Sequence, residues 1–506
     1  MDSPLILETL PGDVIVLIAQ TVHSANNRDL STLACVSHRL RALCFSLLFA
    51  HCRITSEVLL SSEEPPESIR EIVRRMTLDG SFKPLETEHL AQSLGTLFKF
   101  FPNLRHFQIR NVFSGIPWTV WDVCLEKVTS IDINYNSRWR TRNNPILHTP
   151  LYTQRNLLKH LSLGAHAWRA LHSMLGKVDQ IAEYMVESHH LTQLVCGMNE
   201  TAESLALPME TAPLIRMSQM SWPRIQYLSL KGRYPPEMQA TTLPALLSRM
   251  PTLRSLRVQA AQRVTFSRPH IWDSSMAPSS SALSELESLT IAYPNPDDDI
   301  FSVKTPRLIH LSLRDEPRYY FPLRTYDYVS YSIVSPILSA SECLRILQRM
   351  ETPSLTSLEL VYQADTTEDV LLHHIASAYP SLARLELHRY REPDDALVPY
   401  ATVAQILSSI TSLQTVRFNF DSPETPPVHC RDYARKQSWS ALSHSRALDI
   451  LSIMRRCPRL EHIAVLDPRL QCCTWVEYHV RYPGGVAVHA DVLDLYQVDC
   501  DKLPYR

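Results

Sequence analysis

The chain has 506 residues, 45% of them hydrophobic, and a formal net charge of -2 at pH 7. A nearly neutral chain offers no electrostatic basis for binding nucleic acid or an anionic membrane, and no apolar run reaches the roughly 18 residues of a membrane-spanning helix. The 11 cysteines are scattered and odd in number, which is typical of reduced thiols, so we expect a cytoplasmic or nuclear protein.

Three short amphipathic helices are predicted between residues 10 and 49. Pro11 suits a first helical turn, because its missing N–H would have no partner there. Asp13 places a negative charge near the positive end of the helix dipole. About 40 residues usually cannot close a core alone, so we expect this segment to dock on another molecule or domain.

The same segment carries an ordered series of residue types. They are Leu10, Pro11, Asp13, Ile15 to Ile18, Asp29, Leu30, Leu33, Ala34, Cys35, Val36, Ser37, Arg39 and Leu40. In this series the segment resembles the F-box, which implies docking on a Skp-type adaptor of the cullin ligase core of an SCF ubiquitin ligase. By position, the resemblance assigns adaptor contact to Leu10, Pro11, Asp13, Ile15, Ile18, Leu30, Leu33, Val36, Ser37 and Leu40. The alternative is an ordinary helical cap on a larger domain.

From residue 104 on, the chain returns repeatedly to an apolar-x-x-apolar-x-apolar pattern, often just after a proline. The last two apolar positions share one face of a short strand, and the proline ends a preceding helix. A helix–strand unit of this kind buries its apolar face only against its neighbours. The copies begin at Leu104, Val128, Leu158, Leu191, Ile225, Leu253, Leu286, Leu308, Leu355, Leu382, Leu413 and Leu460.

This pattern resembles the strand signature of leucine-rich repeats. The resemblance implies an α/β chain: a three-helix F-box, then an irregular leucine-rich-repeat solenoid with a parallel sheet on its concave face and helices on its convex face. The predicted domains are 1–55 (F-box), 56–80 (linker), 81–470 (repeats) and 471–506 (C-terminal cap with an edge strand). The family's asparagine after the strand is mostly missing, so irregular curvature is expected. A non-repetitive α/β protein is the alternative.

Residues that flank the buried strand positions should point to the concave side. Arginines slightly outnumber acids there, which suits a target with acidic or phosphorylated groups. The predicted target-binding arginines are Arg110, Arg257, Arg314, Arg384 and Arg417. Tyrosines crowd residues 314–335, and tyrosine is a favoured interface anchor, so Tyr319, Tyr320 and Tyr326 join this set. A solvated sheet and a self-packed loop are the alternatives.

Motifs for phosphate binding, dinucleotide binding and nucleophilic catalysis are missing from the sequence. The pairs His189–His190 and His373–His374 diverge on a helix, and Cys472–Cys473 lacks the spacing that zinc needs. We therefore expect no metal, no cofactor and no enzyme. The predicted function is a substrate-recognition subunit that binds a Skp-type adaptor and an unidentified target protein. The alternatives are a leucine-rich-repeat interaction scaffold outside any ligase and an enzyme with a site in the arc.

Overall fold

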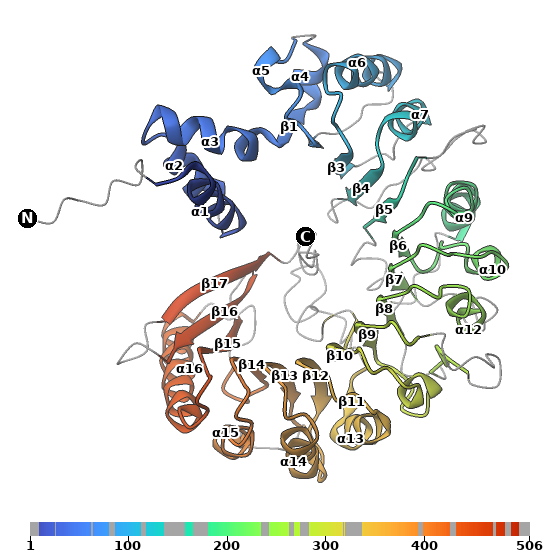
Figure 1. Ribbon diagram of the computed structural model, residues 1–506. Helices are drawn as coiled ribbons and strands as arrows, with labels where there is room; N and C mark the ends of the chain where they lie inside the picture. Colours follow the sequence, from blue (N-terminus) through green and yellow to red (C-terminus); the bar gives the residue numbers. More distant parts are fainter. Residues whose placement is uncertain are drawn as a thin grey trace, which may run out of the picture. The chain divides into compact units, whose positions relative to one another are not determined.

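The computed structural model describes most of the chain. The described residues are 10–25, 27–61, 64–79, 87–112, 118–135, 157–164, 181–233, 242–262, 268–273, 283–316, 318, 336–392, 398–425, 432–468, 472–480 and 487–494. They fall into two compact units, Met1–Gly164 and Ala165–Arg506 (Figure 1). Among them, no helix has both the length and the hydrophobicity needed to cross a bilayer. The prediction of a mixed α/β chain with a mostly parallel sheet is confirmed.

The first unit begins with three helices, α1 (Gly12–Ala25), α2 (Asn27–Ala34) and α3 (His38–Phe49). Ser37 caps α3, because its side chain accepts a hydrogen bond from the backbone N–H of Leu40. The three helices share a small core of Ala19, Leu30, Ala34 and Cys44.

The sheet of the first unit starts directly after α3. Its strands are β1 (His51–Thr55), β2 (Arg75–Asp79), β3 (His106–Val112), β4 (Ser130–Tyr135) and β5 (His160–Leu163), paired in parallel in chain order. The helices between them are α4 (Ser56–Leu60), α5 (Glu67–Arg70), α6 (Thr87–Phe100) and α7 (Trp118–Lys127). The segment 56–80, for which the sequence predicts a linker, thus contains α4, α5 and β2.

The second unit continues the same alternation. Its parallel strands are β6 (Ser204–Pro208), β7 (Tyr227–Arg233), β8 (Ser255–Ala261), β9 (Ser288–Ala292), β10 (His310–Arg314), β12 (Ser357–Gln363), β13 (Arg384–Tyr390), β14 (Thr415–Phe420) and β15 (His462–Pro468), with the short β11 (Leu338–Ser339) beside β12. Two antiparallel strands, β16 (Cys472–His479) and β17 (Ala487–Asp494), follow on β15. The segment with the predicted edge strand forms β17.

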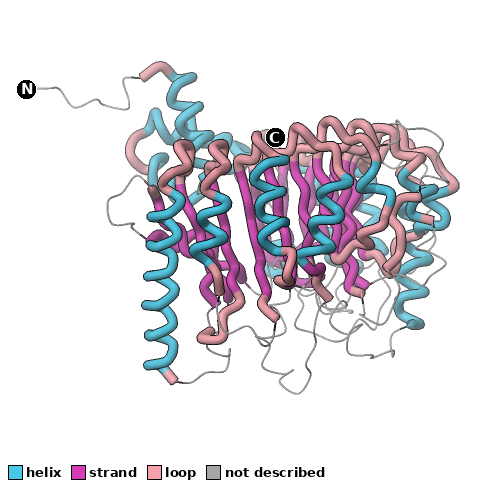
Figure 2. Tube along the Cα trace, turned by 90° about the horizontal axis from the view of Figure 1, so that it is seen from below, coloured by secondary structure: helices cyan, strands magenta, loops and turns pink. Residues whose placement is uncertain are grey.

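The helices of the second unit lie on the outer side of its curved sheet (Figure 1). They are α9 (Ile181–Cys196), α10 (Leu214–Ser218), α12 (Leu243–Leu247), the 3-10 helix η3 (Asp299–Ser302), α13 (Ala340–Arg349), α14 (Glu368–Ala378), α15 (Tyr400–Leu407) and α16 (Tyr433–Met454). In each unit taken separately, the turns that lead from a helix into a strand lie at one edge of the sheet, drawn as pink loops in Figure 2.

One predicted strand is wrong. The copy that begins at Leu191 lies inside helix α9, and the strand at this point of the sheet is β6. Leu191, Leu194, Val195 and Met198 are all buried, at the three- and four-residue spacing of a helical face. The first two apolar positions of the repeat pattern are three residues apart. This spacing occurs in a helix as well as in the turn that leads into a strand.

Candidate functional site

The predicted adaptor-binding residues divide by burial. Ile15, Leu30 and Leu40 have no exposed surface, so their side chains hold the three helices together. Those at least partly accessible are Leu10, Ile18, Leu33 and Ser37, which are half-buried, and Pro11, Asp13 and Val36, which are exposed. Of the predicted residues, only those that are half-buried or exposed can contact a partner without a rearrangement of the three helices.

Helix α1 exposes two apolar side chains, Val14 and Leu17, that were not among the predicted adaptor contacts, and the predicted contact Val36 is exposed as well. Leu17 is 64% exposed and Val36 is 67% exposed, and Val14 is also exposed. We call Pro11, Val14, Leu17 and Val36 the apolar docking surface. Helix α1 is apolar at every position from residue 14 to 19, so one side packs on α2 and α3 and another faces solvent. That unbroken run was the signal for a second apolar side.

A hydrogen bond brings the parts of the apolar docking surface together. The Arg39 guanidinium donates to the carbonyl oxygen of Leu10 over 2.8 Å, so the start of α3 lies beside the start of α1. Val36 lies in the turn just before α3, and Val14 lies one helical turn after Leu10. The bond therefore places the turn that carries Val36 close to the start of α1, which carries Pro11 and Val14.

The predicted target-binding arginines are mostly engaged within the chain. Arg110 donates to Oε1 of Gln108 over 3.0 Å. Arg257 lies 5.7 Å from the ring centre of Tyr227, and Arg314 is only 5% exposed. Arg384 is exposed at the start of β13. Tyr319, Tyr320 and Tyr326 lie outside the described residues.

A cluster of charged side chains lies on the helix-free face of β10, β12 and β13. Glu359 accepts hydrogen bonds from the Ser312 hydroxyl over 2.6 Å and from the Arg318 guanidinium over 2.5 Å. Arg318 also pairs with Asp315 over 3.3 Å. Burial alone would raise the pKa of Glu359, but Arg318 and Arg314 outweigh it and hold the pKa well below its usual range. Glu359 is therefore a buried carboxylate that stays charged.

The neighbouring strand adds a second acid–base pair. Nε2 of His388 lies 2.8 Å from Oε1 of Glu386, and Nδ1 of His388 lies 3.2 Å from Nδ2 of Asn419. The asparagine amide donates, so Nδ1 accepts and Nε2 carries the proton that His388 donates to Glu386. His388 is thus fixed in one tautomer.

Within the described residues, ligand atoms of Glu359, Glu386 and His388 lie within 4.8 Å of one another, which raises the question of a metal ion. Both carboxylates already face arginines. Arg318 pairs with Glu359, and Arg417 lies 3.6 Å from Glu386. A cation here would have to displace these guanidinium groups, so the residues fit a charge-balanced network better than a metal site.

The antiparallel end of the second unit packs against one side of this cluster. Trp475 on β16 is 3% exposed and meets the His388 ring edge to face, with 5.8 Å between ring centres. The Arg417 guanidinium lies 5.4 Å from the centre of the Trp475 ring. Trp475 was not among the predicted site residues, because it lies beyond the repeat pattern.

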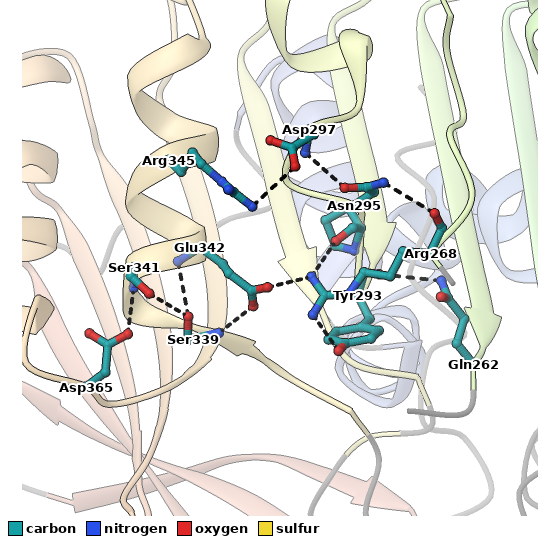
Figure 3. Close-up of polar contacts among 11 residues, drawn as sticks. Gln262, Arg268, Tyr293, Asn295, Asp297, Ser339, Ser341, Glu342, Arg345 and Asp365 are labelled. Carbon is teal, nitrogen blue, oxygen red and sulfur yellow. Dashed lines mark hydrogen bonds and ion pairs between the residues drawn. The ribbon is translucent and has the colours of Figure 1, made fainter. Parts of the chain in front are cut away.

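A second polar network lies at the strand-to-helix edge of the second unit (Figure 3). Arg268 pairs with Glu342 over 2.9 Å and stacks 3.7 Å from the Tyr293 ring centre. Glu342 also accepts from the backbone N–H of Ser339, which completes the capping box of α13. Arg268 thus joins the segment after β8 and the turn after β9 to the first turn of α13.

The chain was compared with known proteins. No protein-family model matches it, and no curated protein matches it. The function must therefore be argued from its residues and their geometry.

Proposed function

We propose that the chain is the substrate-recognition subunit of an SCF-type ubiquitin ligase. The F-box-like helices α1–α3 hold a Skp-type adaptor, and the leucine-rich-repeat-like sheet holds a target protein. The observation that carries the proposal is the apolar docking surface, because Leu17 and Val36 are exposed on the segment that resembles the F-box. Exposed apolar side chains gathered on one surface favour burial against a partner.

The rest of the chain supports a positioning role. Charged groups on the helix-free face are arranged in pairs across neighbouring strands, as with Arg417 and Glu386. Side chains held in this way present a fixed pattern of charge to a bound protein. The alternation of helix and strand agrees with the leucine-rich-repeat resemblance in the sequence.

The proposal is tested by co-purification of the full chain with a Skp-type adaptor. We expect the wild type to retain the adaptor and the double variant Leu17→Asp/Val36→Asp to lose it, because two charges would enter an apolar contact. Both positions are exposed, so the fold should tolerate the change. The control is Val370→Asp, which alters a 54% exposed residue of α14 and should leave adaptor retention unchanged. A wild type that binds no adaptor would refute the proposal.

A scaffold that acts outside any ligase is the second candidate. The charge pairs of the second unit would serve a scaffold equally well, because they do not involve α1–α3. The two functions differ in one measurement. The abundance of a ligase target rises when cullin activity is inhibited, whereas the abundance of a scaffold's partner does not change.

A further inference from the structure

The edge of the first unit where its strands begin has a regular backbone. The carbonyl oxygen of the residue before each strand accepts hydrogen bonds from two backbone N–H groups at the start of the next strand along the chain. The bonds run from Arg74 and Arg75 to Ala50 (both 2.9 Å), from Arg105 and His106 to Arg74 (2.9 and 3.1 Å), from Thr129 and Ser130 to Arg105 (2.9 and 3.0 Å), and from Lys159 and His160 to Thr129 (2.8 and 3.1 Å). The residues before the strands therefore form a row, with neighbours about 4.8 Å apart.

This row is basic. Strands β2, β3 and β5 are entered through the dipeptides Arg74–Arg75, Arg105–His106 and Lys159–His160. We call Arg74, Arg75, Arg105 and Lys159 the basic edge. The three arginines are exposed, so their guanidinium groups are accessible to a partner, and Lys159 is half-buried beside them.

The arginines of the basic edge, Arg74, Arg75 and Arg105, lack direct ion pairs within the part of the chain that the structure describes. Arg75 has only a through-space attraction to the Asp132 carboxylate. Arg105 instead donates to the carbonyl oxygens of Pro102 and Leu104, over 3.3 and 3.2 Å. Both acceptors are neutral carbonyl groups, so these contacts do not neutralise the positive charge of the Arg105 guanidinium.

The second unit provides an internal comparison. Arg254 occupies the matching position before β8, and its backbone forms the same ladder. There, Glu287 stands before the next strand, and its Oε1 lies 3.4 Å from Nη1 of Arg254. The same ladder therefore accommodates an acid beside an arginine, and the first unit has none in its row.

The local electrostatics agree with a concentration of positive charge. Burial, together with Arg75, His51 and His160, lowers the pKa of His106 to about 4. Like charges at neighbouring strand positions destabilise a sheet. A bound anion would reduce this repulsion between the positive charges.

We propose that the basic edge binds an acidic peptide segment, with carboxylate or phosphate groups placed one or two strand spacings apart. The inference rests on the proposed function in that it names the chemical class of the target. A peptide fits better than nucleic acid, because the basic edge holds no Phe, Tyr or Trp on which bases would stack. The net charge of -2 also gives the whole chain no attraction for a long polyanion.

The test uses the full chain without adaptor and four fluorescent ligands in an anisotropy titration. They are a glutamate-rich peptide, the same peptide with phosphoserine in place of glutamate, a glutamine analogue without charge, and a single-stranded RNA of equal length. We expect both anionic peptides to bind more tightly than the neutral one, and the binding to weaken as salt is added. The anionic peptide that binds more tightly shows whether the basic edge prefers carboxylate or phosphate groups.

Variants locate the binding. We expect Arg74→Gln/Arg75→Gln to weaken anionic-peptide binding about tenfold, as for the loss of two exposed ion pairs. The matched control is Arg455→Gln/Arg456→Gln, another exposed arginine pair, which should bind like the wild type. Equal weakening in both variants, no preference over the neutral peptide, or tighter binding of the RNA would each overturn the inference. Loss of adaptor binding with peptide binding intact would refute only the proposed ligase role.

Discussion

Arg389 and Glu368 form a bidentate ion pair inside the second unit. Nε and Nη2 of the arginine donate to the two carboxylate oxygens over 2.7 and 2.9 Å, and Arg389 is only 3% exposed. The Tyr362 hydroxyl donates to the same carboxylate over 3.0 Å. The pair thus joins strands β12 and β13 to the first turn of α14, so it stabilises the packing of a helix on the sheet.

Replacing Arg389 should strongly destabilise the second unit. In Arg389→Met the Glu368 carboxylate stays buried without its cation, and removal of one partner of a buried pair costs about 3 kcal/mol. The measurement is the free energy of unfolding in urea. Arg254→Met is the control, because its pair with Glu287 is solvent-exposed and should contribute less than about 1 kcal/mol. An equal decrease in the free energy of unfolding in the two variants would contradict the special contribution of the buried pair.

Glu359 should make stability depend on pH in the acid range. Its pKa is lowered in the folded protein, so its stabilising contribution is fully present above the unfolded pKa of about 4.3 and is lost as the pH falls through the folded value. We expect Glu359→Gln to be less stable than the wild type at neutral pH, by about 2–4 kcal/mol. The difference should shrink in unfolding measurements made at successively lower pH below 4.3. A difference that stays constant with pH would exclude this role.

His106 should titrate far below an ordinary histidine. Burial and the charges of Arg75, His51 and His160 lower its pKa to about 4, so the ring is neutral at pH 7. The unfolded ring, with a pKa of about 6.5, binds protons first, so this group destabilises the fold as the pH falls from about 6.5 toward 4. Arg75→Gln should raise the pKa of His106. NMR titration of the His106 ring checks both values, and an unchanged pKa in the variant would remove Arg75 as a cause.

The strands were predictable where the repeat pattern follows a proline. After Pro251, the side chains of Leu253, Leu256 and Val258 are all buried, and β8 forms where the pattern places it. The pattern also fits Val73, Met76 and Leu78, which are fully buried, so the sheet begins earlier than the predicted repeats. Strand β2 was therefore predictable from the same pattern, which also occurs before residue 104.

The surface of α1 could not be predicted in the same way. Val14 and Leu17 are exposed whereas Ile15 and Ala19 are buried, although all four are apolar. Periodicity cannot choose between two sides of a helix that is apolar on both. Only the packing of α1 against α2 and α3 decides which side forms the core.

The basic edge also depends on spatial arrangement. Arg74 and Arg105 are distant in sequence, and each alone resembles an ordinary surface arginine. They become neighbours because the backbone of Arg105 bonds to the carbonyl of Arg74 in the parallel register of β2 and β3. Alternation along a strand points to Arg110, which lies within β3, but it carries no information on the turn residues before the strand.

Two glycines should respond to alanine in opposite directions. Gly232 has a φ of +123°, and a Cβ there would collide with the carboxylate of Glu210, which is itself 8% exposed. Gly232→Ala should therefore destabilise the second unit by about 1–3 kcal/mol. Gly95 lies within α6, where a Cβ would meet Val123 at an ordinary 3.8 Å, so Gly95→Ala should stabilise its helix by about 0.5–1 kcal/mol. Urea unfolding of both variants tests the pair, and a Gly232→Ala protein as stable as the wild type would show that β7 adjusts its backbone at this residue.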